Sequence, residues 1–99
     1  MSEAPLFQRV TLIGIGLIGS SLARVMREQN LAGEIVVTTR REETLDRAIA
    51  LGLCDRGTLD MGDAVDGADL VIVCTPMGSY ADVGATIAGH LKPGAIVSD

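Results

Sequence analysis

The amino-acid sequence predicts an α/β fold, a doubly wound parallel sheet covered by helices. Two observations carry this prediction. Short runs rich in β-branched apolar residues alternate with segments whose apolar residues recur at helical spacing. The 99 residues, 47% of them hydrophobic, also contain no long polar or Pro/Ser-rich stretch, which is typical of one compact domain. Right-handed crossovers would then connect about five strands.

A change of period near the amino terminus predicts the first strand and helix. Residues 10–13 form a short apolar run, as expected for a buried parallel strand. Four apolar residues then share one helical face: Ile18, Leu22, Val25 and Met26. Asn30 and Gly33 indicate the end of that helix, before a second strand at residues 35–39.

The remaining elements continue this alternation. A second helix, ending near Gly52, is expected to bury Leu45, Ala48 and Ile49. Residues 53–67 contain few apolar residues, so only a short strand and one short helix around residues 64–65 are expected there. The clearest strand spans residues 69–74, and a last strand begins at residues 95–97. Between them, one helical face would carry Tyr80, Val83, Ile87 and Leu91.

Charge and composition argue against several classes of function. A net charge of −5 and an isoelectric point near 4.6 argue against nucleic-acid binding, which usually requires a basic face. Cys54 and Cys74 form no CxxC pair and have no neighbouring histidine, so no zinc site is expected. No apolar run approaches the ~20 residues of a membrane helix, and the start lacks a basic signal-peptide region. A cytoplasmic protein without membrane association is therefore expected.

The glycine-rich segment 14–19 predicts where a phosphate-bearing ligand binds. It follows a strand, opens an amphipathic helix and lies in a strand-helix-strand unit, which is the context of the Rossmann dinucleotide-binding fingerprint. Gly14 would permit the tight turn, Gly16 would let the backbone approach a pyrophosphate, and Gly19 would let the helix pack on the strand. Unpaired N–H groups at the helix start would favour the negative charge. The alternative is a tight turn that binds nothing.

Cofactor preference is predicted from the residues about 20 positions further on, where NAD-binding proteins usually carry a carboxylate for the ribose hydroxyls. Here the position is Thr39, followed by Arg40 and Arg41. Guanidinium groups suit a 2′-phosphate, so NADP is preferred over NAD as the expected cofactor. The alternative is a solvated arginine pair before Glu42 and Glu43 at a helix start.

The segment Cys74-Thr75-Pro76 follows the clearest strand at its carboxyl end, where ligands bind in open α/β sheets. These residues are expected to line the nicotinamide ribose. The Cys74 side chain is interpreted as a small buried hydrophobe rather than a nucleophile. His90 is interpreted as a helix cap rather than a general base.

Three segments resemble the amino-terminal domain of the prephenate and arogenate (cyclohexadienyl) dehydrogenases: residues 14–23, 68–76 and 91–99. The resemblance implies oxidation of prephenate or arogenate in tyrosine biosynthesis, with hydride passing to a nicotinamide dinucleotide while loss of carbon dioxide makes the ring aromatic. The cofactor-binding residues of that family carry over to Gly14, Gly16, Leu17, Ile18, Gly19, Thr39, Arg40, Cys74, Thr75 and Pro76. The missing acidic residue at position 39 departs from its strictly NAD-dependent members.

The resemblance also implies what this chain lacks. The catalytic histidine and serine of such enzymes match no residue here, His90 included. Residues 1–99 are expected to be an incomplete dinucleotide-binding domain, inactive alone, with its carboxyl-terminal part and the helical dimerisation domain missing. The full-length enzyme would be a homodimer. Two alternatives stay open: a stand-alone NAD(P)-sensing regulatory module, and the cofactor domain of another hydroxyacid dehydrogenase or an imine reductase.

Overall fold

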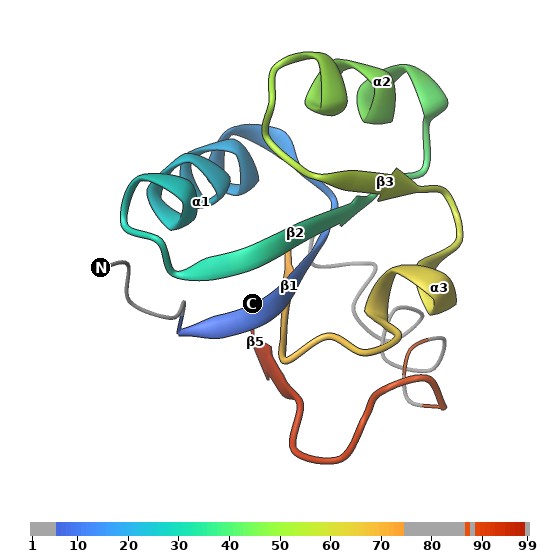
Figure 1. The fold of residues 1–99 in the computed structure, drawn as a ribbon. Coiled ribbons are helices and arrows are strands. Elements are labelled where there is room, and N and C mark those ends of the chain that lie inside the picture. Colours follow the sequence, from blue (N-terminus) through green and yellow to red (C-terminus); the bar gives the residue numbers. More distant parts are fainter. Residues whose placement is uncertain (1–5, 75–86, 88, 99) are drawn as a thin grey trace.

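The computed structural model describes residues 6–74, 87 and 89–98, and it confirms the predicted α/β class. A parallel five-stranded sheet has the order β3-β2-β1-β4-β5. Its strands are β1 (Phe7–Ile13), β2 (Ala32–Thr38), β3 (Arg56–Thr58), β4 (Leu70–Val73) and β5 (Ile96–Ser98). The helices are α1 (Gly16–Glu28), α2 (Glu42–Ala50) and α3 (Met61–Val65). Figure 1 shows α1 and α2 on one side of the sheet and α3 on the other.

Strands β1 and β2 begin earlier than the sequence predicted, at Phe7 and Ala32. Polar or charged residues, Gln8, Arg9 and Glu34, interrupt these first parts of the strands, which therefore fall outside the apolar runs. Arg9 of β1 lies opposite Glu34 of β2 in the parallel register, and their side chains form an ion pair. Cross-strand pairing therefore extends the strands where hydrophobicity does not.

The core beneath α1 and α2 is aliphatic. It contains Val10, Leu12, Ala23, Met26, Ile35, Val37, Leu45, Ala48, Leu53 and Cys54. Val25 and Ile49, which the sequence placed on the apolar faces of the two helices, are each 47% exposed. In α1 the buried side chains are Ala23 and Met26. Helical spacing from these two positions directs Val25 toward solvent.

A second cluster lies on the other face of the sheet, with α3. It contains Ile13, Val65, Ala68, Val71, Val73 and Ile87. The buried Thr11 hydroxyl donates a hydrogen bond to the Ala64 carbonyl and so ties β1 to α3. The His90 ring also lies against α3, since a Cβ on Gly62 would come 2.8 Å from His90 Nε2. The predicted helical face from Tyr80 to Leu91 falls largely outside the described residues.

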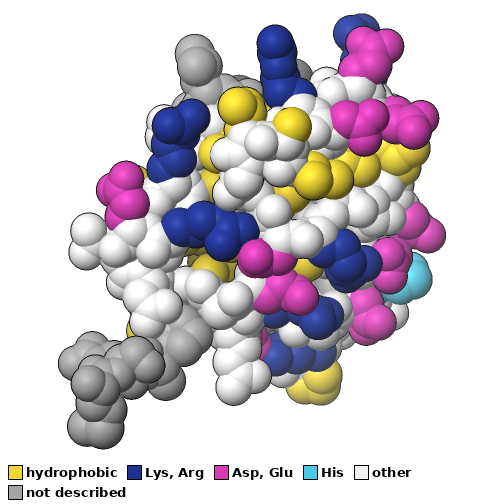
Figure 2. Space-filling view, turned by 45° about the horizontal axis from the view of Figure 1, so that its top comes forward, with side chains coloured by type: hydrophobic (Ala, Val, Ile, Leu, Met, Phe, Trp, Pro, Cys, Tyr) yellow, Lys and Arg dark blue, Asp and Glu magenta, His cyan; other side chains and the backbone are white. Residues whose placement is uncertain are grey.

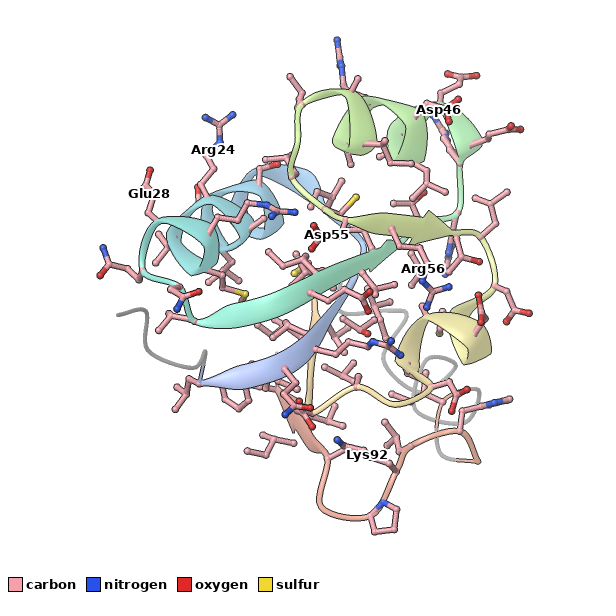
Figure 3. All side chains as sticks on the ribbon, in the orientation of Figure 1. Arg24, Glu28, Asp46, Asp55, Arg56 and Lys92 are labelled. Carbon is pink, nitrogen blue, oxygen red and sulfur yellow. The ribbon has the colours of Figure 1, made fainter. Side chains whose placement is uncertain are left out.

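Two aspartates at the amino edge of the sheet accept hydrogen bonds from the backbone of neighbouring strands. Asp69, before β4, accepts hydrogen bonds from the backbone N–H groups of Gln8 and Arg9 at 2.8 and 3.0 Å, and from the Lys92 ammonium. The Lys92 bond and then the Arg9 bond lower the pKa of this carboxyl. Asp55, before β3, accepts from the Ile35 N–H at 2.8 Å. Because each aspartate precedes a strand, both lie at the amino edge of the sheet, opposite to the carboxyl ends, where Figure 3 labels Asp55 and Lys92.

The surface carries charges of both signs. Figure 2 shows Lys and Arg side chains interspersed with Asp and Glu on the face that it displays. Such a mixture lacks the one-signed field that attracts a polyanion. Among the residues described, no helix has both the length and the apolar character needed to cross a lipid bilayer.

Candidate cofactor-binding site

The turn between β1 and α1 has the geometry predicted for the glycine-rich segment. Gly14 has a φ of 84°, in the left-handed region that favours glycine, and its N–H donates to the Thr38 carbonyl at 2.7 Å. Helix α1 starts at Gly16, and Leu17 and Ile18 follow in its first turn. No side chain caps this start. Within the described part of the chain, the N-cap residue Ile15 thus supplies no side-chain acceptor to the first N–H groups of the helix.

Gly19 brings α1 close to the end of β4. A Cβ at this position would lie 3.4 Å from both the Cys74 sulfur and the Ile15 Cδ1 atom. The Cys74 N–H donates to the Ile13 carbonyl at 2.8 Å, which holds the end of β4 against β1. Burial raises the pKa of the Cys74 thiol. A raised pKa keeps the thiol protonated, which favours the packing interpretation over a nucleophile.

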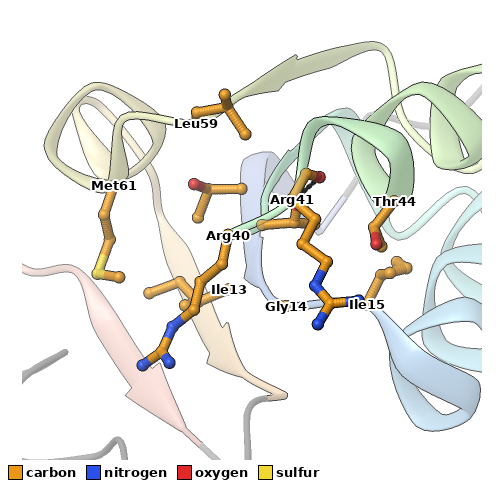
Figure 4. A pocket seen from close by; sticks show the side chains of 10 residues that line it. Ile13, Gly14, Ile15, Arg40, Arg41, Thr44, Leu59 and Met61 are labelled. Atoms are coloured by element: carbon orange, nitrogen blue, oxygen red, sulfur yellow. Dashed lines mark hydrogen bonds between the residues drawn. The ribbon is translucent and has the colours of Figure 1, made fainter.

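A pocket opens where the carboxyl ends of β1, β2 and β3 meet (Figure 4). Its volume is about 280 Å³, and it is lined by Ile13, Gly14, Ile15, Thr38, Thr39, Arg40, Arg41, Thr44, Leu59 and Met61. The structure therefore brings together four of the residues predicted from the sequence: Gly14, Thr39, Arg40 and Arg41. Cys74 does not line this pocket and lies beside Gly19 instead. Thr75 and Pro76 fall outside the described residues.

Six lining residues were not predicted as site residues from the sequence: Ile13, Ile15, Thr38, Thr44, Leu59 and Met61. Leu59 and Met61 follow β3 and, with Ile13 and Ile15, give the pocket an apolar wall. Thr44 reaches it from the first turn of α2. The available signal was topological, because parallel strands end at one edge of the sheet and the residues that follow them converge there.

The β2–α2 turn carries the predicted arginines. Figure 4 shows the Arg41 side chain extending toward the turn at Gly14 and Ile15, and Arg40 extending past Ile13 on the side of Met61. Both arginines are exposed and line the pocket.

The Thr39 hydroxyl donates to the Arg41 carbonyl at 2.8 Å, within the same turn. Arg41 is the N-cap residue of α2, has an extended backbone with φ −114° and ψ 129°, and makes no side-chain cap bond. Its carbonyl also accepts the Leu45 N–H at 3.2 Å. The Arg41 carbonyl thus accepts hydrogen bonds both from Thr39, which lines the pocket, and from Leu45 of α2.

Residues 9–99 match the family described as NADP oxidoreductase, coenzyme F420-dependent. The chain belongs to this family. The matched residues include the glycine turn, the pocket and all strands from β2 to β5, so the family and the predicted fold agree.

The chain is also similar to dehydrogenases of cyclohexadienyl acids. It is 40% identical over 93 residues to the cyclohexadienyl dehydrogenase of Zymomonas mobilis, covering 94% of this chain and 32% of that protein. The arogenate dehydrogenase of Synechocystis superposes with a TM-score of 0.82 at 28% identity, covering 91% of this chain and 31% of that one.

The prephenate dehydrogenase of A. aeolicus, solved with hydroxyphenyl propionate and NAD+, superposes with a TM-score of 0.83 at 26% identity. That match covers 91% of this chain and 32% of the other. The chain thus spans about a third of the length of these relatives. The similarity confirms the resemblance that the sequence indicated, for this part of the enzymes.

Proposed function

We propose that this chain is the cofactor domain of a prephenate or arogenate dehydrogenase and that it binds NADP in preference to NAD. The pocket carries the proposal, because it places the glycine turn and two arginines around one space at the carboxyl edge of the sheet. The 40% identity to a cyclohexadienyl dehydrogenase supports the enzyme class. The NAD+ complex of the A. aeolicus enzyme supports a nicotinamide dinucleotide.

The residues of the site fit such a ligand part by part. The start of α1, at Gly16 to Ile18, where the N-cap residue Ile15 makes no side-chain cap bond, suits the pyrophosphate, and the absence of a side chain on Gly14 leaves the approach open. The apolar wall of Leu59 and Met61 suits the adenine base. A volume of about 280 Å³ is at the small end of ligand pockets, which are roughly 300–1,000 Å³, so it suits the adenosine half.

The 2′-phosphate is the group that would distinguish NADP. Arg40 and Arg41 can supply charge-assisted, fork-shaped hydrogen bonds to it. Thr39 supplies no negative charge to repel it. In this proposal Cys74, Thr75 and Pro76 line the nicotinamide ribose, as the sequence predicts.

The bound dinucleotide would supply the hydride acceptor for oxidative decarboxylation of the cyclohexadienyl acid. The residues of this chain bind and orient it: the α1 amides hold the diphosphate, and the apolar wall and the arginines fix the adenosine end. None of the described residues is proposed as catalytic, and His90 packs on Gly62 of α3. The proposal extends to a homodimeric, cytoplasmic enzyme of tyrosine biosynthesis.

Calorimetric titration of the 99-residue chain with NADP and with NAD tests the cofactor proposal. We expect both to bind, NADP more tightly. A folded sample that binds neither at millimolar concentration would refute the dinucleotide site, and tighter binding of NAD would refute the preference. Turnover of prephenate and arogenate, assayed with the complete gene product, tests the enzyme class separately.

A further inference from the structure

We propose that Thr39 is a positioning residue for NADP: its hydroxyl holds the turn that presents Arg40 and Arg41. The inference rests on the proposed function and deepens it. It assigns cofactor preference partly to an uncharged side chain that acts through the backbone.

The hydrogen bonds around Thr39 form a continuous connection from the glycine turn to α2. Gly14 donates its N–H to the Thr38 carbonyl at 2.7 Å, which ties the glycine turn to the last residue of β2. One residue on, the Thr39 hydroxyl donates to the Arg41 carbonyl at 2.8 Å. That carbonyl also accepts the Leu45 N–H at 3.2 Å, and a carbonyl oxygen can accept two such bonds.

This connection matters because Arg41, the N-cap residue of α2, makes no side-chain cap bond, whereas the Thr39 hydroxyl holds its backbone by donating to its carbonyl. N-cap positions favour Ser, Thr, Asp or Asn, whose side-chain oxygens accept an N–H of the first turn. Arg41 has no acceptor in its side chain, and no side-chain cap bond is formed at this position. The Thr39 bond therefore fixes the Arg41 backbone from the preceding side. Both arginines are carried by the three-residue turn that it closes.

A carboxylate at position 39 could not take over this role. An ionised Asp or Glu only accepts hydrogen bonds, so it could not donate to the Arg41 carbonyl. It would also repel a phosphate while accepting bonds from ribose hydroxyls, as in NAD-binding proteins. The Thr39 hydroxyl, in contrast, donates to the Arg41 carbonyl and places no charge in the pocket. Hydroxyl chemistry at this position thus favours NADP in two ways.

Two variants separate this role from simple packing. Thr39→Val keeps the branched shape and removes the hydroxyl, whereas Thr39→Ser keeps the hydroxyl and serves as the matched control. Loss of one intramolecular hydrogen bond is worth about a three- to tenfold change in an equilibrium. We expect Thr39→Val to weaken NADP binding by about that factor and NAD binding much less, and Thr39→Ser to bind both as the unmodified chain does.

The affinities are measured by calorimetric titration of the 99-residue chain, and hydrogen exchange of the Leu45 amide gives a readout without ligand. That exchange should be faster in Thr39→Val and normal in Thr39→Ser. An unchanged NADP/NAD ratio in Thr39→Val, an equal loss for both dinucleotides, or failure of serine to restore the ratio would overturn the role of Thr39. Thr39→Ala replaces the valine variant if the latter does not fold. Binding of neither dinucleotide by the unmodified chain would instead refute the proposed function itself.

Discussion

At the scale of single residues, charge at the pocket decides which dinucleotide binds. We expect Arg40→Asp to weaken NADP binding by about tenfold or more, since hydrogen bonds to charged groups are worth about 1.5–3 kcal/mol. NAD, which has no 2′-phosphate, should bind as before. Isothermal titration of both dinucleotides measures the two affinities.

Arg24→Asp is the matched control, because Arg24 extends from α1 into solvent away from the pocket (Figure 3). It makes the same change of charge and should leave both affinities within about twofold, since exposed charges are screened by salt. If Arg40→Asp behaves like Arg24→Asp, the arginines of the β2–α2 turn do not recognise the 2′-phosphate.

The sequence predicted those site residues whose role depends on one continuous stretch of chain. The φ of 84° at Gly14 and the close packing at Gly19 follow from three glycines in one turn. Arg40 and Arg41 follow from their distance along the chain. Leu59 and Met61 lie beyond a short strand in a stretch with few apolar residues, and they reach the pocket only because β3 lies beside β2. When two segments meet only because their strands are neighbours in the sheet, the sequence around each segment carries no pattern that predicts the contact.

At the scale of elements, a strand position without a side chain lets a helix approach the sheet closely. Gly57 of β3 is the clearest case, because a Cβ there would lie 2.5 Å from Leu45 Cδ1 and 2.9 Å from Leu45 Cγ. Leu45 is a core residue of α2. The sequence predicted a short strand in this stretch but gave no reason for a glycine in its middle. The reason is the approach of α2.

We therefore expect Gly57→Ala to destabilise the fold by about 1–3 kcal/mol, the usual cost of overpacking a core. Gly89→Ala is the control, because a Cβ at Gly89 would meet nothing within 4 Å. Urea denaturation followed by circular dichroism gives both free energies of unfolding. Equal stability of the two variants would mean that Leu45 moves aside at no cost.

The aspartate before β4 makes the stability of the sheet depend on pH. Lys92, followed by the Arg9 N–H, lowers the pKa of Asp69 from its ordinary value of 3.8. Because the folded-state pKa lies below the unfolded one, the stabilisation is complete above the unfolded value and is lost as the pH falls through the folded value. Asp69→Asn should thus lower the melting temperature at pH 7, and the difference from the unmodified chain should shrink in acid.

Thermal unfolding at pH 7 and at pH 2 measures this dependence, with Asp46→Asn as control because Asp46 lies on the outer side of α2 (Figure 3). A difference between Asp69→Asn and the unmodified chain that persisted at pH 2 would assign the effect to shape rather than charge. Dinucleotide affinity should be retained in both variants, since Asp69 is at the amino edge of the sheet.

At the scale of the whole molecule, the two edges of the sheet have separate tasks. The amino edge carries the Asp55 and Asp69 bonds that hold strands together, and the carboxyl edge carries the pocket. The radius of gyration of 12.6 Å is close to the ~13 Å of a compact domain of 100 residues. The chain therefore packs as one unit, although it spans about a third of its relatives' length.

Strand β5 forms an edge of the described sheet that can pair with a strand of another molecule. It pairs with β4 and stands last in the strand order of the described sheet, while Ile96 and Val97 are 53% and 46% exposed. Unpaired backbone groups beside exposed apolar side chains can bind another strand. We therefore expect the 99-residue chain to self-associate through β5 as its concentration rises.

Val97→Lys should suppress this association, because a charge on an edge strand opposes strand addition. Leu51→Lys is the control: Leu51 is 58% exposed but follows α2, away from the β5 edge. If edge pairing drives the association, only the first variant should lower the average mass in light scattering across a concentration series. Equal suppression by both would point to general hydrophobic contact, and an unmodified chain that stays monomeric throughout would show that three residues of exposed strand are too few to recruit a second copy.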